Sequence, residues 1–199
     1  MKILYVSLFI ILLDQMTKLL VRGFEIPSLG VKVEGMRIGE TKQIIGDLVR
    51  ITYTENPGIA FGINLGNKFY LTLFALIAAI IVFIYLYRVR NGNFTIRLSL
   101  GMILGGAIGN LIDRVFYGVI FNYGKIFHGR VVDFIDIDFF DINIFGYHID
   151  RWPIFNIADA SVTIGVLILL FSHHKESSQA QIEEIKPEML ESDAGNEKQ

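Results

Sequence analysis

The sequence predicts a membrane α-helical protein with four transmembrane helices, a small extracytoplasmic β-sheet and a second extracytoplasmic loop segment. Hydrophobic side chains make up 52% of the 199 residues and charged side chains only 19%, a composition unlike that of soluble domains. Apolar segments about long enough to cross a bilayer recur four times. The predicted spans cover about residues 3–21, 69–87, 98–113 and 154–172, and residues 1–172 are expected to form one polytopic membrane domain.

The first span begins like a secretory signal, with Met1 and Lys2 before an apolar run. No small-residue cleavage site follows, and the apolar residues resume at Leu19, so we expect an uncleaved helix. Asp14 and Lys18 lie four residues apart within it, in the favourable order for an ion pair on one helical face. The pair either neutralises two charges near the membrane boundary or supports a functional site.

Residues 22–68 form the first predicted extracytoplasmic loop, which is punctuated by glycines. Within it, the run from Leu48 to Tyr53 is rich in β-branched and aromatic residues and is bounded by turn formers, which is typical of a strand. We therefore expect a small antiparallel sheet outside the hydrocarbon region. The turn sequence Asn56-Pro57-Gly58 follows it.

Orientation is predicted from the short connection after the second span. Phe69 to Tyr87 contains no charged residue, and the next ten residues contain Arg88, Arg90 and Arg97. Short loops rich in arginine stay in the cytoplasm, whereas long loops cross largely regardless of charge. Both termini are therefore expected in the cytoplasm, with the long loops 22–68 and 114–153 on the other side.

The third span contains two stripes of residues at four-residue spacing. Gly101, Gly105 and Gly109 form a small-xxx-small pattern that lets two helix backbones approach closely. An adjoining stripe is expected to face the bundle interior and consists of Gly106, Asn110 and Arg114. Asp113 either joins this polar group or makes a local salt link.

Acidic and apolar residues alternate from Val131 to Asp141, as in an amphipathic strand along a membrane surface. Asp136, Asp138 and Asp141 are most simply a solvated face. Asp133 does not fit this solvated face as simply as those three acids, because it lies in the most apolar part of the run. The acidic tail, residues 173–199, is expected to be a disordered cytoplasmic appendage.

The fourth span carries a carboxylate, Asp159, inside an otherwise apolar run. An acid at membrane depth costs several kcal/mol unless it is paired, hydrated or neutralised, so it is either functional or an interhelical hydrogen-bonding group. Asn156 precedes it by three residues, and on one helical face its amide could hold the carboxyl rotamer.

Composition excludes several kinds of chemistry. The chain has no cysteine, its four histidines show no metal-binding spacing, and its net charge is −2. We expect no metal, no cofactor and no nucleic-acid partner. Two carboxylates close together in a low-dielectric site would share a proton and could activate water, as in aspartic proteases. From the residues alone, a proton-relay or transport protein and a structural membrane subunit remain as alternatives.

Five segments in order resemble the motifs of bacterial lipoprotein signal peptidases (signal peptidase II). They are Asp14-Gln15-Met16-Thr17-Lys18, Asn56-Pro57-Gly58-Ile59-Ala60-Phe61-Gly62, Gly105 to Arg114, Val131-Val132-Asp133-Phe134, and Phe155-Asn156-Ile157-Ala158-Asp159. The resemblance covers residues 14–165. It implies an aspartic endopeptidase of the bacterial inner membrane, monomeric, that removes the signal peptide from diacylglyceryl-modified prolipoproteins just before the lipidated cysteine, with membrane lipid as its other partner.

The resemblance also implies a role for each residue of this sequence that matches a functional position in the family's motifs. It implies that Asp133 and Asp159 are the catalytic pair, and that Asp14 and Lys18 support the site. Residues that would position the substrate or the aspartates are Asn56, Gly106, Asn110, Arg114 and Asn156. The chain departs from the family's usual pattern at Ile59, where a smaller residue is common, and in three longer segments: 22–47, 114–131 and 133–156.

Overall fold

The computed structural model describes residues 1–60, 63–64, 68–138, 142–144, 147–149 and 151–172. Among them, three helices are long and apolar enough to cross a membrane: α1 (Leu4–Arg22), α2 (Lys68–Arg88), and α3 (Phe94–Ile112) with its continuation to Ile120. A shorter apolar helix, here called the C-terminal helix, runs from Ile157 to Ser172. The expected helical membrane architecture is thus present, and the tail 173–199 lies outside the described residues.

Two helices begin at other positions than the predicted spans do. Helix α3 begins at Phe94 because the Asn93 side chain accepts a hydrogen bond from the Thr95 backbone N–H over 2.8 Å, which caps the helix. The C-terminal helix begins at Ile157 and not at residue 154, because the backbone of Phe155 is still hydrogen-bonded to Ile135 of the sheet.

Helix α3 packs against α1 through the predicted glycine stripe. A Cβ on Gly105 would lie 3.0 Å from atoms of Ser7 and Ile10, and one on Gly101 would lie 3.1 Å from Ile3. The Ser7 hydroxyl donates to the Gly101 carbonyl over 2.7 Å. The close approach of the two backbones is therefore confirmed. Helix α3 also contacts α2, so it occupies the middle of the bundle.

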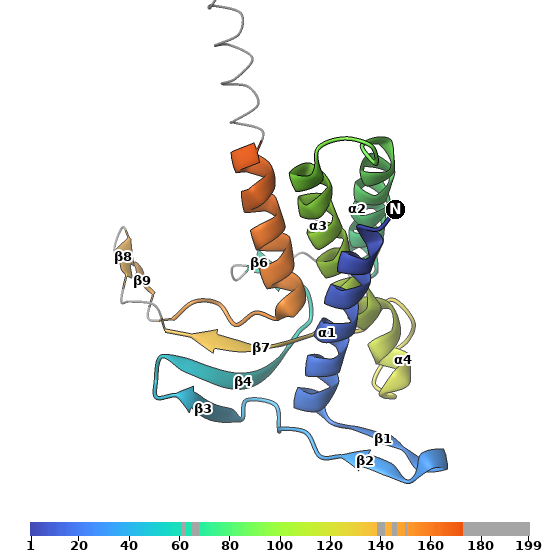
Figure 1. The fold of residues 1–199 in the computed structure, drawn as a ribbon. Coiled ribbons are helices and arrows are strands. Elements are labelled where there is room, and N and C mark those ends of the chain that lie inside the picture. The colour runs from blue at the N-terminus through green and yellow to red at the C-terminus, as the bar shows by residue number, and fades with distance from the viewer. Residues whose placement is uncertain (61–62, 65–67, 139–141, 145–146, 150, 173–199) are drawn as a thin grey trace, which may run out of the picture.

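An antiparallel sheet lies across the end of the bundle where α1 ends (Figure 1). Its strand order is β3 (Thr41–Ile45), β4 (Val49–Asn56), β7 (Val131–Ile137). The predicted strand at 48–53 is confirmed as most of β4. Because β7 runs antiparallel to β4, Thr54 is opposite Asp133 and Asn56 is opposite Val131. The pairing brings the two segments between the helices together.

Smaller elements complete the chain. Helix α3 continues through a π-helical turn, η2 (Asp113–Tyr117), into the short helix α4 (Gly118–Ile120). A hairpin of β1 (Phe24–Ile26) and β2 (Val31–Val33), joined through the 3₁₀ turn η1 (Pro27–Leu29), extends from the end of α1. Two further hairpins are β5 (Ile59–Ala60) with β6 (Ile63–Asn64) and β8 (Ile142–Ile144) with β9 (Tyr147–Ile149).

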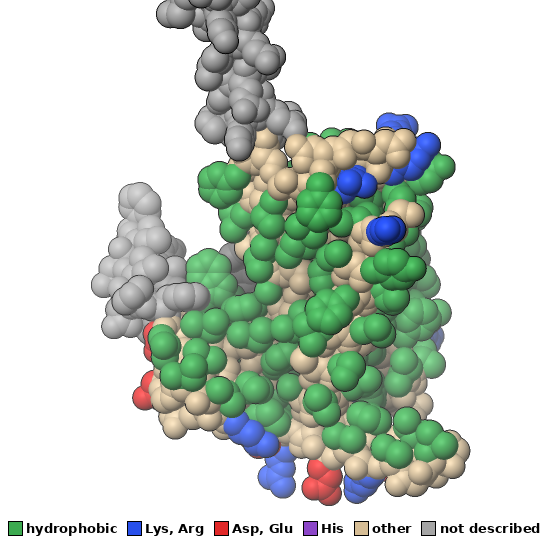
Figure 2. All heavy atoms as spheres, in the orientation of Figure 1, with side chains coloured by type: hydrophobic (Ala, Val, Ile, Leu, Met, Phe, Trp, Pro, Cys, Tyr) green, Lys and Arg blue, Asp and Glu red, His purple; other side chains and the backbone are tan. Residues whose placement is uncertain are grey.

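Apolar and charged side chains occupy different zones of the surface along the length of the helix bundle. Figure 2 shows hydrophobic side chains covering the middle of one face, with Lys and Arg at both ends and acidic side chains at the sheet end. Many large apolar side chains of α1 and α2 are exposed, among them Phe9 at 64% and Phe74 at 74%. Such a surface requires an apolar solvent, which a bilayer supplies.

The expected solvated face on residues 131–141 is wrong for Asp136. This residue is only 6% exposed, and its carboxylate accepts hydrogen bonds from Thr52 and from Arg151, each over 2.7 Å. The physical reason is that β4 and Arg151 cover this side of β7, which strand alternation cannot reveal. Asp138 is partly buried and pairs with Arg151 at 3.1 Å, whereas Asp141 lies outside the described residues.

Candidate active site

Asp133 lies in the middle of β7, at the junction of sheet and helices. It is 4% exposed, and its neighbours Val132 and Phe134 belong to the hydrophobic core there. The Asn156 amide donates to its Oδ1 over 2.6 Å. Burial raises the pKa of Asp133 to about 7, the nearby charge of Asp159 acts in the same direction, and hydrogen bonds from Asn156 and Asn56 oppose the shift. Asp133 is therefore suited to hold a proton near neutral pH.

Asp159 is held at the start of the C-terminal helix by a reciprocal cap. The Asn156 side-chain oxygen accepts from the Asp159 backbone N–H over 2.9 Å, and the Asp159 Oδ2 accepts from the Asn156 backbone N–H over 3.2 Å. This is a capping box, with Asn156 as the N-cap residue. The expectation that both residues lie on one helical face is corrected: Asn156 precedes the helix, and the spacing of three arises from the cap.

Asn156 links the two carboxyl groups. Its oxygen is used by the Asp159 N–H, so its Nδ2 must donate, and it does so to Asp133 and more weakly to the Val132 carbonyl at 3.3 Å. Asn156 is fully buried. One residue therefore contacts both carboxyl groups, that of Asp133 through its side-chain amide and that of Asp159 through its backbone N–H.

Asn110 fixes the second oxygen of Asp159. The Asn110 side-chain oxygen accepts from Lys18 Nζ at 2.8 Å and from Asn156 Nδ2 at 3.1 Å. With its oxygen so occupied, the Asn110 amide nitrogen donates to Asp159 Oδ1 over 2.8 Å. The predicted inward orientation of Asn110 is confirmed.

Lys18 is fully buried and has three partners. Its Nζ lies 2.8 Å from Asp14 Oδ2, 2.9 Å from Asp113 Oδ2 and 2.8 Å from Asn110. The ammonium group thus uses its three donors on two carboxylates and an amide. Asp14 and Lys18 form the ion pair that their spacing predicts, and Asp113 joins them in one polar cluster with Asn110.

Asp14 and Asp113 each hold the backbone immediately before a candidate catalytic aspartate. Asp14 Oδ1 accepts from the Ala158 N–H over 2.9 Å, and Asp113 Oδ2 accepts from the Val132 N–H over 3.1 Å. Both carboxylates bind the same Lys18. One buried charge cluster thus binds the backbone of both β7 and the C-terminal helix.

Gln15 was not among the predicted site residues, yet it completes this cluster. Its Nε2 donates to Asp113 Oδ1 at 2.8 Å and to the Gly109 carbonyl at 3.1 Å, while its oxygen accepts from the Tyr117 hydroxyl at 3.1 Å. In the sequence it is a polar residue inside an apolar span, and it lies within the motif Asp14-Gln15-Met16-Thr17-Lys18.

Three other predicted residues surround the carboxyl pair. The Asn56 side chain hydrogen-bonds Asp133 and accepts from the Gly58 N–H over 2.8 Å. The Arg114 guanidinium lies beside Gly58 and within electrostatic range of Asp133 and Asp159. Gly106 packs against the first turn of the C-terminal helix, where a Cβ would collide with the Ala158 carbonyl. Glycine here allows α3 and that helix to approach.

Within the described part of the chain, no group of three or more acidic or histidine side chains is placed to hold a metal ion. The Asp133 and Asp159 carboxyl groups are held there by the side-chain amides of Asn156 and Asn110. A protonated and an ionised carboxyl group side by side can together polarise a carbonyl and activate water.

Comparison with known proteins is consistent with this geometry. A family model described as signal peptidase (SPase) II matches residues 6–175. The lipoprotein signal peptidase of Chlorobium phaeobacteroides (strain BS1) is 36% identical over 166 residues, which cover 83% of this chain and 91% of that one. The corresponding protein of Halothermothrix orenii is 37% identical over 165 residues, covering 83% and 90%.

A solved structure of a bacterial membrane enzyme superposes with a TM-score of 0.62 at 32% sequence identity, covering 89% of this chain and 90% of the other. The fold is thus shared as well as the sequence. Since the family model spans most of the residues, and relatives above 30% identity align along most of their length, this chain belongs to the signal peptidase II family of aspartic peptidases.

Proposed function

We propose that this chain removes signal peptides from prolipoproteins and that Asp133 and Asp159 are its catalytic pair. Family membership supports the activity. The observation that supports the pair is the Asn156 side chain, which binds the Asp133 carboxyl group and the Asp159 backbone at once. A transporter would be expected to distribute polar groups through the membrane depth, whereas α2 has no charged residue from Phe69 to Tyr87.

In the proposed mechanism, Asp133 carries the proton and Asp159 is the carboxylate. Asp159 takes a proton from water, whose oxygen attacks the scissile carbonyl carbon, while Asp133 gives its proton to the carbonyl oxygen. The tetrahedral diol then collapses: the C–N bond breaks, the amine nitrogen takes the proton from Asp159, and Asp133 recovers its own from the diol. Each proton and electron pair is accounted for without any cofactor.

In this proposal the other predicted residues take no part in proton transfer and instead position the reacting groups. Asn56, Asn110 and Asn156 orient the carboxyl groups through their amides, and Gly106 admits the C-terminal helix at close range. Arg114 supplies a positive charge near the pair, for the substrate backbone or the tetrahedral oxygens. Asp14 and Lys18, with Asp113, hold the framework from behind.

We further propose four membrane spans in a single polytopic domain, residues 1–172, in the bacterial cytoplasmic membrane, with the sheet and the loops 22–68 and 114–153 on the extracytoplasmic side. The short loop with Arg88, Arg90 and Arg97 supports cytoplasmic termini. The carboxyl pair then lies at the outer boundary, where the apolar signal helix of a substrate can lie among the spans. A diacylglyceryl-modified precursor, cut just before its lipidated cysteine by a monomeric enzyme, suits this depth.

The test is cleavage of a purified prolipoprotein by the purified chain in detergent, with lipidated and unlipidated precursors compared. We expect the signal peptide to be released from the lipidated precursor alone, because the lipid places the scissile bond at the boundary. Mass spectrometry of the products gives the cut position. Cleavage of both forms at equal rates would contradict the lipid requirement, and lack of any cleavage by folded protein would contradict the activity.

The rate is expected to fall as the pH rises through about 7. Burial raises the pKa of Asp133 to about 7, so this group loses its proton there and the pair becomes doubly charged. The protonated, active form of Asp133 prevails below this pKa and is lost above it. A profile of kcat/KM against pH checks this, with thermal unfolding at each pH as the control. A rate that rises through pH 7 would exclude Asp133 as the proton donor.

A further inference from the structure

Glu55 is an acidic residue of β4 that the proposed mechanism does not use, although it lies immediately before Asn56. Its side chain is only 5% exposed. The Tyr53 hydroxyl donates a hydrogen bond to its Oε1 over 2.8 Å. Burial by itself would raise the pKa of Glu55, but the hydrogen bond from Tyr53 and the charge of Arg22 leave that pKa below its usual range. Glu55 is therefore an anion at neutral pH.

Two arginines from distant parts of the chain pair with this carboxylate, one at each oxygen. Arg22 is the last residue of α1; it contacts Oε1 and also donates to the Tyr53 hydroxyl over 2.9 Å. Arg130 directly precedes β7 and contacts Oε2 at 3.2 Å. Glu55 therefore links the end of α1 to the start of β7.

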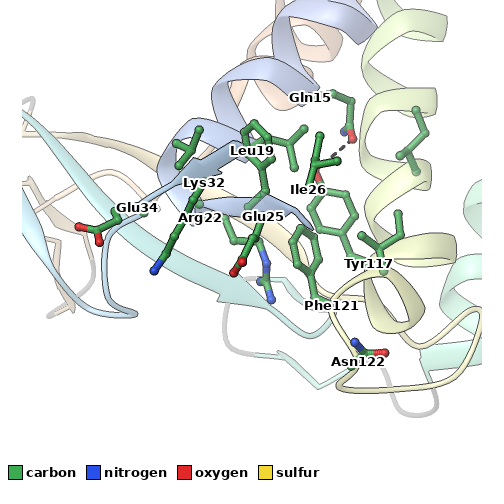
Figure 3. Close-up of a pocket in the computed structure, with 16 residues that line it drawn as sticks. Gln15, Leu19, Arg22, Glu25, Ile26, Lys32, Glu34, Tyr117, Phe121 and Asn122 are labelled. Atoms are coloured by element: carbon green, nitrogen blue, oxygen red, sulfur yellow. Dashed lines mark hydrogen bonds between the residues drawn. The ribbon is translucent and has the colours of Figure 1, made fainter. Parts of the chain in front are cut away.

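Aromatic side chains hold both arginines independently of Glu55. The Arg22 guanidinium lies 3.9 Å from the centre of the Phe121 ring, and both side chains line the pocket that Figure 3 shows. The Arg130 guanidinium lies 5.4 Å from the centre of the Tyr123 ring, and the Tyr123 hydroxyl accepts from the Arg130 backbone N–H over 3.0 Å. Contacts of this kind stabilise a cation over a ring. Without Glu55, two cations would therefore remain at this place with their shared anion removed.

The strand register puts this cluster at one end of the β4–β7 pair. Glu55 is opposite Val132, and Asn56, the last residue of β4, is opposite Val131. Neighbouring side chains along a strand point to opposite faces, so those of Glu55 and Asn56 diverge. Val132 belongs to the hydrophobic core, whereas the Asn56 side chain hydrogen-bonds Asp133. Glu55 thus holds the backbone next to Asn56 from the face that is turned away from the carboxyl pair.

We propose that Glu55, by binding Arg22 and Arg130, is a positioning residue that holds Asn56 against Asp133. Its contact with Arg130 closes the end of the β4–β7 pair, and its contact with Arg22 fastens that end to α1. Such closure matters because terminal residues open most easily. The inference rests on the proposed function, in which the Asn56 amide orients Asp133.

Glu55→Gln is the first variant to test, because it keeps the size of the side chain and removes the charge between the two arginines. We expect kcat for a lipidated prolipoprotein to fall about 10- to 100-fold, since small displacements of a reacting group have effects of this size. KM should change little, because Glu55 faces away from the carboxyl pair. Arg130→Met, at a side chain that is 42% exposed, should lower kcat in the same way and serves if Glu55→Gln does not fold.

The matched control is Asp136→Asn. Asp136 is also a buried acid of this sheet, 6% exposed and paired with an arginine, but it lies toward the other end of β7 and does not adjoin Asn56. The control should lower thermal stability, as Glu55→Gln should, and leave the kcat of the folded fraction unchanged. Equal kcat values for the two variants would overturn the proposal.

A double substitution tests whether Glu55 acts through Asn56. In the Asn56→Ala background the hydrogen bond to Asp133 is already absent, so adding Glu55→Gln should lower kcat no further. Two losses that multiply in the double variant would show that Glu55 acts by another route and would overturn the proposal.

Hydrogen exchange tests the positioning without reference to activity. The backbone amides of residues 54–56 and 131–132 should exchange faster in Glu55→Gln than in the wild-type chain, and at the wild-type rate in Asp136→Asn. Unchanged exchange in Glu55→Gln would overturn the inference even where the wild-type chain cleaves its substrate. Lack of cleavage by the wild-type chain would instead contradict the proposed peptidase activity, so the two failures are distinguishable.

Discussion

Asp133→Asn and Asp159→Asn are each expected to slow cleavage of a lipidated prolipoprotein by about 10²- to 10⁴-fold. Asparagine keeps the size of the side chain but can neither take a proton from water nor give one to the carbonyl oxygen. General acid and base contributions are each worth about 10²- to 10⁴-fold, and the loss should fall in kcat. KM should change little, because neither group is proposed to bind the signal helix. Steady-state assays in detergent at varied substrate concentration measure both constants.

The matched control is Asp138→Asn. Asp138 follows the same strand but pairs with Arg151 on the far side of the sheet from the carboxyl pair. We expect this variant to cleave at a rate within about twofold of the wild type, as is usual for surface substitutions. If Asp159→Asn or Asp133→Asn kept the rate of Asp138→Asn, the dyad mechanism would be wrong.

Lys18→Met is expected to cause the largest loss of stability. The substitution leaves two buried carboxylates, Asp14 and Asp113, without the cation that lies within 2.9 Å of both. Breaking a buried ion pair by removing one partner costs about 3–5 kcal/mol. Cleavage should fall as well, because Asn110 loses the contact that orients its amide toward Asp159. Unfolding in detergent and kcat on the folded fraction measure the two effects separately.

A second substitution makes this prediction specific to charge. In Lys18→Met with Asp113→Asn, one of the two uncompensated charges is removed, so part of the lost stability should return. Lys42→Met is the surface control, because Lys42 is 61% exposed and its nearest carboxylate oxygen, on Glu40, is 3.6 Å away. Equal destabilisation by Lys18→Met and Lys42→Met would show that the buried cluster does not hold the framework.

Much of the fold can be predicted from the sequence because it depends on local composition. Uninterrupted apolar runs predict the helices, since a backbone in hydrocarbon must satisfy its hydrogen bonds within one segment. The β-branched run at 48–53 predicts β4, and the glycine stripe on α3 predicts the close approach of α1. The motifs that resemble signal peptidase II were confirmed at the level of the family.

The contacts within the site could not be predicted from the sequence in the same way. Asn156, Asp136 and Gln15 are three examples. The spacing of Asn156 and Asp159 suggested a shared helical face, but it belongs to a helix cap. The alternation around Asp136 suggested a solvated strand face, but Arg151 covers it. Gln15 lies within the motif from Asp14 to Lys18, but nothing in the sequence predicts its hydrogen bonds to Asp113 and Tyr117.

The sequence by itself determined the class of protein, the approximate spans, the β4 strand and the residue types from which an aspartic site could be built. Only the tertiary structure decided that Asp14, Lys18 and Asp113 form one cluster behind Asp133 and Asp159. The physical reason is that the hydrogen bonds of this cluster join residues from α1, α3, β7 and the C-terminal helix, which are up to 144 positions apart. Such contacts depend on how helices pack and strands pair, and local periodicity carries no information about them.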